Sequence, residues 1–253
     1  MRFLATADTD VGINKTTNQD SILIKHALYD DGEILMAIVC DGMGGLSKGE
    51  LASATVINAF SKWFDESLAY ELDAINMEVI GGKWSLMLKD LNIKIAEYGK
   101  TIGESLGTTF SGIFFIGERY VIVHVGDSRI YQIGSSMHQL TTDQTFVARE
   151  ISRGTMTLEQ AKTDKRRNLL LQCVGASEIV EPQVLCGTTE KGAYMLCTDG
   201  FRHEITENEM YESINPINLM NKQAMHNNTK YLIEQVKSRR EKDNISVILI
   251  KVE

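Results

Sequence analysis

Proline, paired cysteines and long hydrophobic runs are scarce in this chain, and each shortage excludes a class of protein. Only two prolines occur among 253 residues, so no proline-rich linker divides the chain. None of the four cysteines has a partner at zinc-knuckle spacing, and a small buried residue in a reducing compartment is the simpler interpretation. No stretch approaches the ~20 apolar residues of a membrane span, and the N-terminal residues lack the apolar core of a signal peptide. We therefore expect one cytoplasmic domain covering residues 1–253, with no membrane partner.

Positive charge is also in short supply. Lysine and arginine together number 26 against 34 aspartates and glutamates, which gives a formal net charge of −8. This balance argues against a general affinity for nucleic acid or for an anionic membrane surface. Hydrophobic residues make up 43% and charged residues 24%, as in ordinary soluble domains, and a chain of this length can bury a large core.

Strand and helix patterns follow one another in blocks. Apolar runs predict strands at residues 2–7, 21–28, 33–40, 108–116, 120–125, 129–133, 184–187, 193–197 and 245–252. Helical spacing predicts helices at 49–68, 84–98, 207–213 and 228–240, with Gly81-Gly82 interrupting the first helical region. The turn at residues 30–32 predicts a hairpin, and we expect 184–187 to pair with 193–197. The pattern indicates antiparallel sheets with helices packed outside them.

Five aspartates lie at the ends of these strands. Asp41, Asp127 and Asp199 follow apolar runs, whereas Asp20 and Asp243 precede them. In an antiparallel sheet the end of one strand lies beside the start of its neighbour, so all five carboxylates can meet on one rim. Crowded carboxylates resist ionisation unless cations neutralise them, and clustered oxygen ligands suit Mg²⁺ or Mn²⁺. The sequence therefore predicts a hydrolytic site that holds more than one metal ion.

Asp41 suits the position between two ions. A carboxylate and a water can bridge divalent ions about 4 Å apart, and the shared water then loses a proton near neutral pH. The glycine-rich residues 42–45 after Asp41 leave room for a backbone carbonyl or a substrate to approach. For a single Asp-Gly pair, a plain turn is the better interpretation. Two such pairs after buried strands, with three further strand-end acids, favour the metal site.

Residues 141–168 stand apart from the rest of the chain. They carry six basic and four acidic side chains in a chain that is acidic overall. Two interpretations stay open: a solvated helical excursion, or a mobile flap over an anionic substrate.

Seven short motifs occur in order along the chain and together resemble one family. They lie at residues 18–21, 39–45, 107–109, 125–129, 140–143, 197–200 and 242–246. The chain resembles the metal-dependent protein serine/threonine phosphatases of the type 2C family, bacterial branch, over essentially its whole length. The resemblance implies an α+β fold, a central β-sandwich of two antiparallel sheets flanked by helices on both sides. It also implies hydrolysis of phosphoserine and phosphothreonine by in-line attack of a metal-bridged hydroxide, without a phosphoenzyme.

The resemblance also implies a role for each acid. Asp41 would bridge two core ions of Mn²⁺ or Mg²⁺, the Gly42 carbonyl would complete one of them, and Asp199 and Asp243 would hold the other. These three aspartates would thereby hold the attacking hydroxide. Asp20 would act through metal-bound waters, and Asp127 would bind a third ion together with Asp199. Asn244 and Asp143 would orient the metal-binding residues without binding the ions themselves.

The chain departs from the family pattern in three places. Lys15 stands where the family usually has an arginine that grips the substrate phosphate, and lysine, a point charge, cannot make the bidentate contact. We expect weaker phosphate binding, or a second cation that completes the pocket; a surface lysine is the alternative. Met43 stands where some members have a histidine, which leaves a metal-bound water as the proton donor. Residues 144–145 and 164–168 differ from the usual flap motifs. Of the family's properties, the substrate preference linked to the flap is therefore the one that carries over least to this chain.

Three alternatives to a general phosphoprotein phosphatase stay open. The chain could hydrolyse small phosphate esters, serve as a regulatory phosphatase for a single partner, or be a catalytically silent phosphoprotein-binding module. The silent module predicts the loss of metal acids, and all five are present. The expected partners are phosphorylated proteins and a cognate serine/threonine kinase that shares those substrates, and we expect a monomer.

Overall fold

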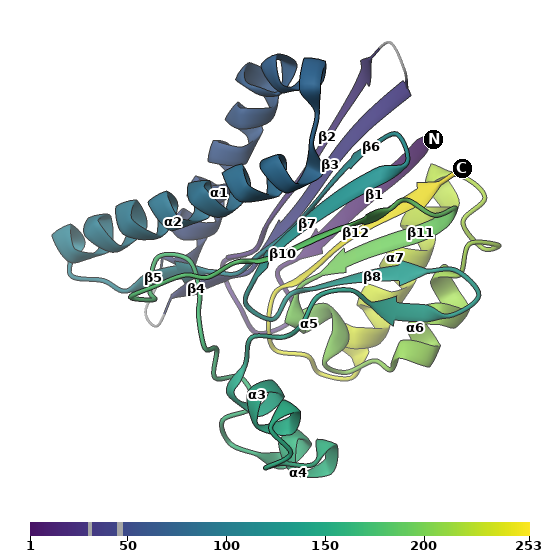
Figure 1. Ribbon diagram of the computed structural model, residues 1–253. Coiled ribbons are helices and arrows are strands. Elements are labelled where there is room, and N and C mark those ends of the chain that lie inside the picture. Colours follow the sequence, from purple (N-terminus) through teal and green to yellow (C-terminus); the bar gives the residue numbers. More distant parts are fainter. Residues whose placement is uncertain (30–31, 45–47) are drawn as a thin grey trace.

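Two antiparallel sheets lie face to face in the computed structural model, which describes residues 1–29, 32–44 and 48–253 (Figure 1). The first sheet has the order β1 (Phe3–Asp10), β12 (Ile245–Val252), β11 (Gly192–Cys197), β8 (Arg129–Ile133) and β9 (Met137–Gln139). The second has the order β10 (Gln183–Thr188), β7 (Arg119–Val125), β6 (Phe110–Ile116), β3 (Gly32–Cys40) and β2 (Ser21–Tyr29). A short ribbon, β4 (Gly42–Gly44) with β5 (Leu106–Thr108), lies beside them and was not predicted.

Helices cover both outer faces of the sandwich. The second sheet carries α1 (Gly49–Glu66) and α2 (Met77–Ile102), joined by the 3₁₀ helix η1 (Leu68–Ala74). The first sheet carries α5 (Asp199–Arg202), α6 (Glu207–Ile214) and α7 (Lys222–Ser238). Two short helices, α3 (Phe146–Ser152) and α4 (Leu158–Thr163), project from one end of the sandwich (Figure 1). The predicted α-β-β-α layers are confirmed. Within the described part of the chain, no helix combines the length and apolarity that a membrane crossing requires.

The period-2 alternation of strand side chains builds the three core layers. In β3, Ile34, Met36 and Ile38 pack against α1 and α2, whereas Leu35 and Val39 face the other sheet. All five side chains are at most 1% exposed. A strand covered on both faces must be apolar at every position, which explains the unbroken hydrophobic run that predicted it.

Gly81-Gly82 does not interrupt the helical region, so that prediction was wrong. Both glycines lie inside α2. Each costs roughly 1 kcal/mol of helix propensity relative to alanine. A side chain at Gly81 would overlap Val184 of β10, so this glycine lets α2 pack directly on the sheet. Tertiary packing therefore outweighs the local preference of glycine.

The predicted pairing of 184–187 with 193–197 was also wrong. β10 pairs with β7 at the edge of the second sheet, whereas β11 lies between β12 and β8 in the first. β10 alternates between exposed and partly buried residues, as an edge strand does, but β11 is buried along nearly its whole length. The chain crosses between the sheets after Thr188, so two strands adjacent in sequence belong to different layers.

The hairpin of β2 and β3 is confirmed, with Ser21 opposite Cys40 and Tyr29 opposite Gly32. Two of its predicted turn residues, Asp30 and Asp31, lie outside the described residues. The predicted helix at 228–240 begins six residues earlier, at Lys222, because the Asn221 side chain accepts a hydrogen bond from the Ala224 backbone and caps the helix there.

Candidate active site

The five strand-end aspartates converge at one end of the sandwich. Burial raises the pKa of Asp41 well above its ordinary value, and the negative charges of Asp20, Asp199, Asp243 and Asp127 raise it further. Since charges shift one another's ionisation mainly at short range, all five carboxylates lie in one neighbourhood. Three of them come from the second sheet and two from the first. The cluster therefore lies across the mouth of the sandwich, as the strand-end pattern predicts.

Asp41 is held by backbone and hydroxyl contacts. Its N–H donates to Thr109 Oγ1 at 2.9 Å, and its carbonyl accepts from Thr109 N and from Thr108 Oγ1, both at 2.9 Å. These bonds fix the end of β3 to the residue between β5 and β6. The Gly-Thr-Thr motif therefore positions the central acid. From the sequence, residues 107–109 were recognisable only as one of the seven motifs that resemble the family.

Gly42 follows in a space that excludes any side chain. A Cβ there would overlap the carbonyl oxygens of Gln19 and Gly49. The backbone of Gly42 consequently runs between the approach to β2 and the first residue of α1. The expected loop continues through residues 45–47, which lie outside the described residues.

Asp20 is linked to the opposite sheet. Thr198 Oγ1 donates to Asp20 Oδ2 at 3.0 Å. Burial raises the pKa of Asp20 to about 7, the hydrogen bonds from Ser246 and Thr198 lower it, and the charges of Asp199 and Asp243 add to the rise. An acid with this pKa is readily neutralised near neutral pH, by a proton or by a cation.

Asp199 is the first residue of α5 and has an unsatisfied acceptor. Its Oδ1 is buried and makes no hydrogen bond to any residue that the structure describes. Its Oδ2 lies 3.5 Å from His203 Nε2. A side chain at Gly200 would overlap the carbonyl oxygen of Asn244, so glycine allows α5 to pack against the start of β12. A buried carboxylate oxygen without a donor is the kind of atom that a cation satisfies.

Asp243 is paired with Lys15. Lys15 Nζ lies 3.0 Å from Asp243 Oδ1, and both side chains are 41% exposed. Burial lowers the pKa of Lys15, but the hydrogen bond to Asp243 and the charges of Asp41 and Asp199 outweigh it, so the pKa is raised. Lys15 is therefore a charged group beside the acidic cluster, not an isolated surface lysine.

Asn244 fixes the segment that carries Lys15. Its Oδ1 accepts from the Gln19 backbone N–H at 2.9 Å, and its Nδ2 donates to the carbonyls of Val11 at 2.9 Å and Thr17 at 3.2 Å. The side chain is buried. Asn244 thus orients the surroundings of Asp243 and Asp20.

The oxygen donors suit a divalent ion in kind, although they are spread in space. Within residues 1–29, 32–44 and 48–253, no three His, Cys, Asp or Glu side chains are grouped tightly enough to hold one ion as they stand. The donor set is nonetheless all oxygen, mutually repelling and partly unsatisfied at Asp199. These features fit Mg²⁺ or Mn²⁺, and the carboxylates must draw together around such an ion.

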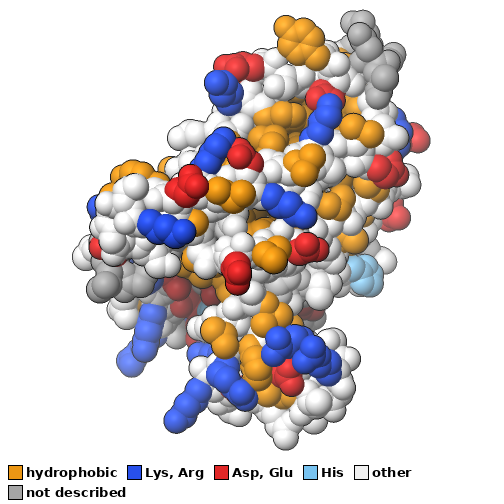
Figure 2. Space-filling model, turned by 60° about the vertical axis from the view of Figure 1, so that its left-hand side comes forward, with side chains coloured by type: hydrophobic (Ala, Val, Ile, Leu, Met, Phe, Trp, Pro, Cys, Tyr) orange, Lys and Arg blue, Asp and Glu red, His pale blue; other side chains and the backbone are white. Residues whose placement is uncertain are grey.

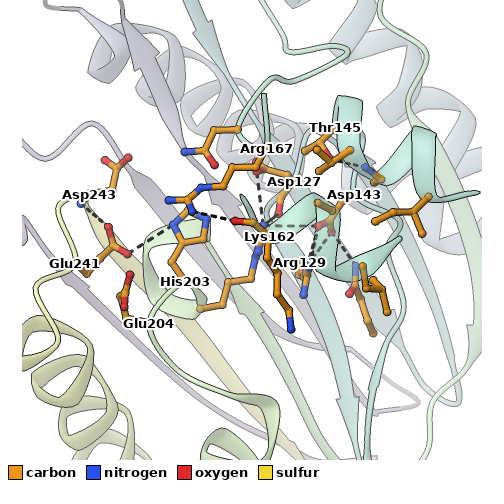
Figure 3. A pocket seen from close by; sticks show the side chains of 18 of the residues that line it. Asp127, Arg129, Asp143, Thr145, Lys162, Arg167, His203, Glu204, Glu241 and Asp243 are labelled. Atoms are coloured by element: carbon orange, nitrogen blue, oxygen red, sulfur yellow. Dashed lines mark hydrogen bonds and ion pairs between the residues drawn. The ribbon is translucent and has the colours of Figure 1, made fainter. Parts of the chain in front are cut away.

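A pocket of about 1080 Å³ adjoins the cluster (Figure 3). Lys15, Asp127 and Asp243 lie on the side of the sandwich. The opposite wall belongs to the α3–α4 segment, residues 146–163, together with the residues that follow it. That wall presents Val147, Ile151, Leu158, Lys162 and Arg167. The basic region at 141–168 therefore borders the same space as the acids, as the flap interpretation requires.

Asp143 lies outside the acidic cluster and forms its own ion pair. Arg129 Nε donates to Asp143 Oδ1 at 2.8 Å and Arg129 Nη2 donates to Oδ2 at 2.7 Å. Burial would raise the pKa of Asp143, but Arg129 and Arg202 together hold it below its ordinary value. Asp143 consequently orients two arginines beside the pocket.

Sequence reasoning missed Arg129, Arg202 and His203 as residues of the site. Arg202 Nη2 donates to the Asp127 carbonyl at 3.0 Å and lies 3.6 Å from Asp127 Oδ2. His203 lies between Asp199 and Glu241. The available signal was spacing: Arg202 and His203 follow Asp199 by three and four residues, which places them one helical turn away.

Comparisons with known proteins agree with this architecture. The family model described as protein phosphatase 2C matches residues 12–242. Protein phosphatase PhpP of Streptococcus pneumoniae is 30% identical over 96% of this chain and 95% of its own length. The serine/threonine phosphatase of S. agalactiae superposes with a TM-score of 0.86 at 26% identity, covering both chains fully. The catalytic domain of the phosphatase PstP, solved with two manganese ions, gives 0.78 at 26% identity over 98% of this chain and 97% of that one. The chain belongs to the protein phosphatase 2C family.

Proposed function

We propose that this protein is a metal-dependent serine/threonine phosphatase that removes phosphate from phosphoserine and phosphothreonine in proteins. The observation that carries the proposal is the meeting of five aspartates from both sheets beside a pocket that both acidic and basic side chains line. Membership of the phosphatase family supports the same activity.

The residues present fit two divalent ions. Asp41, Asp199, Asp243 and the Gly42 carbonyl would hold these ions, and Asp20 would act through water. Bound Mn²⁺ or Mg²⁺ would supply the positive charge that screens the phosphate and acidify the attacking water. A third ion, which the family resemblance implies at Asp127 and Asp199, would have to share Asp127 with the guanidinium of Arg202.

The chain's own residues would position the substrate. Lys15 lines the pocket with its ammonium group beside Asp243, which supports its role as the phosphate-binding cation. Asn244 holds the segment carrying Lys15, and the Arg129–Asp143 pair braces the adjacent wall. In-line attack requires the phosphate to be held between the acidic cluster and these cations.

The size and lining of the pocket favour a phosphoprotein over a small phosphate ester. The α3–α4 wall combines apolar and basic side chains, which the residues flanking a phosphorylated serine or threonine can contact. Figure 2 shows the basic and hydrophobic side chains gathered on this lowest part of the molecule. Closure of this segment as a flap, a cytoplasmic location, a monomeric state and a partner kinase are further parts of the proposal, drawn from the sequence.

Turnover of p-nitrophenyl phosphate and of a phosphothreonine peptide, each titrated with Mn²⁺, tests the proposal. Asp199→Asn should abolish Mn²⁺-dependent turnover of both substrates and keep the circular dichroism spectrum. Asp65→Asn is the matched control, since Asp65 lies on α1 and pairs with Lys25 of β2, away from the pocket, and the turnover of this variant should stay unchanged. A higher kcat/KM for the peptide supports protein substrates. Equal turnover by Asp199→Asn and wild type would refute the assignment, and metal-independent turnover would do the same.

A further inference from the structure

Arg202 lies against the carboxylate that a third divalent ion would need. Its Nη2 lies 3.6 Å from Asp127 Oδ2 and 3.7 Å from Asp143 Oδ2, and it also donates to the Asp127 backbone carbonyl at 3.0 Å. The side chains of Arg202 and Asp127 are only 12% and 10% exposed. The Arg202–Asp127 contact is therefore a largely buried part of the pocket wall and not a solvent-exposed ion pair.

A second arginine closes the network. Arg129 makes a bidentate pair with Asp143, which in turn faces Arg202 (Figure 3 shows Arg129, Asp127 and Asp143). Two carboxylates and two guanidinium groups then balance each other without any bound ion. The other charged neighbours of Asp127 are His203 and Asp199, and burial together with Asp199 raises the pKa of Asp127 to about 7 even beside Arg202.

The position of Arg202 follows from the backbone. It is the last residue of α5, the short helix whose first residue is Asp199. Gly200 lets this helix contact the start of β12, so the same turn delivers Asp199 to the cluster and Arg202 to Asp127. A guanidinium keeps its proton in proteins, so this positive charge persists at every working pH. A divalent ion at Asp127 would have to displace it or bind beside it against charge repulsion.

We propose that Arg202 is a built-in cation that occupies the place of a third metal ion at Asp127, so that the chain binds two divalent ions and not three. The proposal rests on the phosphatase assignment, because that assignment supplies the two core ions. Arg202 then brings to the pocket wall part of the positive charge that a third ion would carry.

Counting bound Mn²⁺ by equilibrium dialysis with electron paramagnetic resonance tests this independently of turnover. The wild-type chain should bind two Mn²⁺ at saturation, and Asp127→Asn should also bind two. Arg202→Met, which keeps an unbranched apolar stem but removes the guanidinium group, should gain a third, weaker ion. The double variant Arg202→Met/Asp127→Asn should return to two. Arg167→Met is the matched control: it removes a guanidinium from the same pocket without touching Asp127, and should bind two.

Three Mn²⁺ in the wild-type chain, one of them lost in Asp127→Asn, would overturn the proposal, and that comparison does not depend on any Arg202 variant folding. A folded Arg202→Met that still binds two would overturn it as well. If the wild-type chain bound no Mn²⁺ at all, the phosphatase assignment itself would be refuted. Failure of this proposal and failure of the proposed function therefore give different numbers of bound ions.

Discussion

Neutralising Asp20 should stabilise the metal-free protein at neutral pH, although it removes a charge that metal binding would use. Burial raises the pKa of this carboxyl from 3.8 to about 7, hydrogen bonds from Ser246 and Thr198 lower it, and Asp199 and Asp243 add to the rise. Asparagine is nearly isosteric and keeps an oxygen for the Thr198 hydroxyl, which donates to Asp20 at 3.0 Å. Asp20→Asn therefore removes the buried charge and leaves the contact between the sheets.

Proton linkage sets the sign and the size of the stability change in Asp20→Asn. Because the folded-state pKa is above the unfolded value, the folded protein holds this proton more tightly. The stabilisation is fully present below about pH 4 and is lost as the pH rises toward about 7. A rise of about three pKa units corresponds to at most about 4 kcal/mol. Because asparagine accepts a weaker hydrogen bond from Thr198 than the carboxylate does, we expect Asp20→Asn to gain less than this, about 1–3 kcal/mol of folding free energy at pH 7.5. For a chain of this size that is a rise of about 2–10 °C in Tm.

Thermal unfolding in EDTA from pH 5 to 8 measures this. The Tm of the wild type should fall with rising pH, the Tm of Asp20→Asn should fall less, and saturating Mn²⁺ should raise the wild type more than the variant. Asp143→Asn is the control of opposite sign: Arg129 and Arg202 hold the pKa of Asp143 low against the effect of burial, so losing its charge should cost about 1–3 kcal/mol. A metal-free Asp20→Asn that melts below the wild type at pH 7.5, or that shows the same pH slope, would refute the reasoning.

Two further substitutions test the backbone and the phosphate-binding cation. Gly200→Ala places a Cβ against the Asn244 carbonyl, so it should lose about 1–3 kcal/mol in urea unfolding and weaken Mn²⁺ binding, whereas Gly134→Ala, which meets nothing, should keep both. Lys15→Ala should raise KM for a phosphothreonine peptide about 10-fold with a smaller change in kcat, while Lys15→Arg, able to make a bidentate contact, should lower KM below the wild type. An unchanged KM for Lys15→Ala in steady-state assays would show that Lys15 is a surface lysine with no role in phosphate binding.

Local patterns predicted the layers well because burial acts on each strand separately. The unbroken apolar run of β3 is required by cover on both faces, and the strand ends then place Asp41 and Asp20 side by side through the Ser21–Cys40 register. Strand pairing was predictable only within a hairpin. The pairing of β10 with β7 joins distant residues, and it depends on which sheet each strand enters. Sequence adjacency carries no information on that choice.

The arginines of the site could not be predicted from the sequence for a related reason. An aspartate at a strand end has a direction set by the strand, but a long arginine can reach any acid within several ångströms. The spacing of Arg202 from Asp199 places it one turn along α5, but does not say that it faces Asp127 on the other sheet. That contact depends on how the two sheets are offset, whereas the Lys15–Asp243 pair depends on the course of the loop that follows β1, the strand that pairs with β12.

The division of the acids between the sheets makes metal binding a property of the whole sandwich. Asp20, Asp41 and Asp127 belong to one sheet and Asp199 and Asp243 to the other, so their repulsion acts across the interface between the sheets. Polar contacts between the sheets at this end oppose it, among them Thr198 to Asp20, Asn244 to the Gln19 backbone and Arg202 to Asp127. Ions shared by acids of both sheets would replace that repulsion with a crosslink. Loosening the buried layer between the sheets, for instance at Phe115 and Tyr194, whose rings pack 5.0 Å apart, should therefore weaken ion binding without touching any ligand.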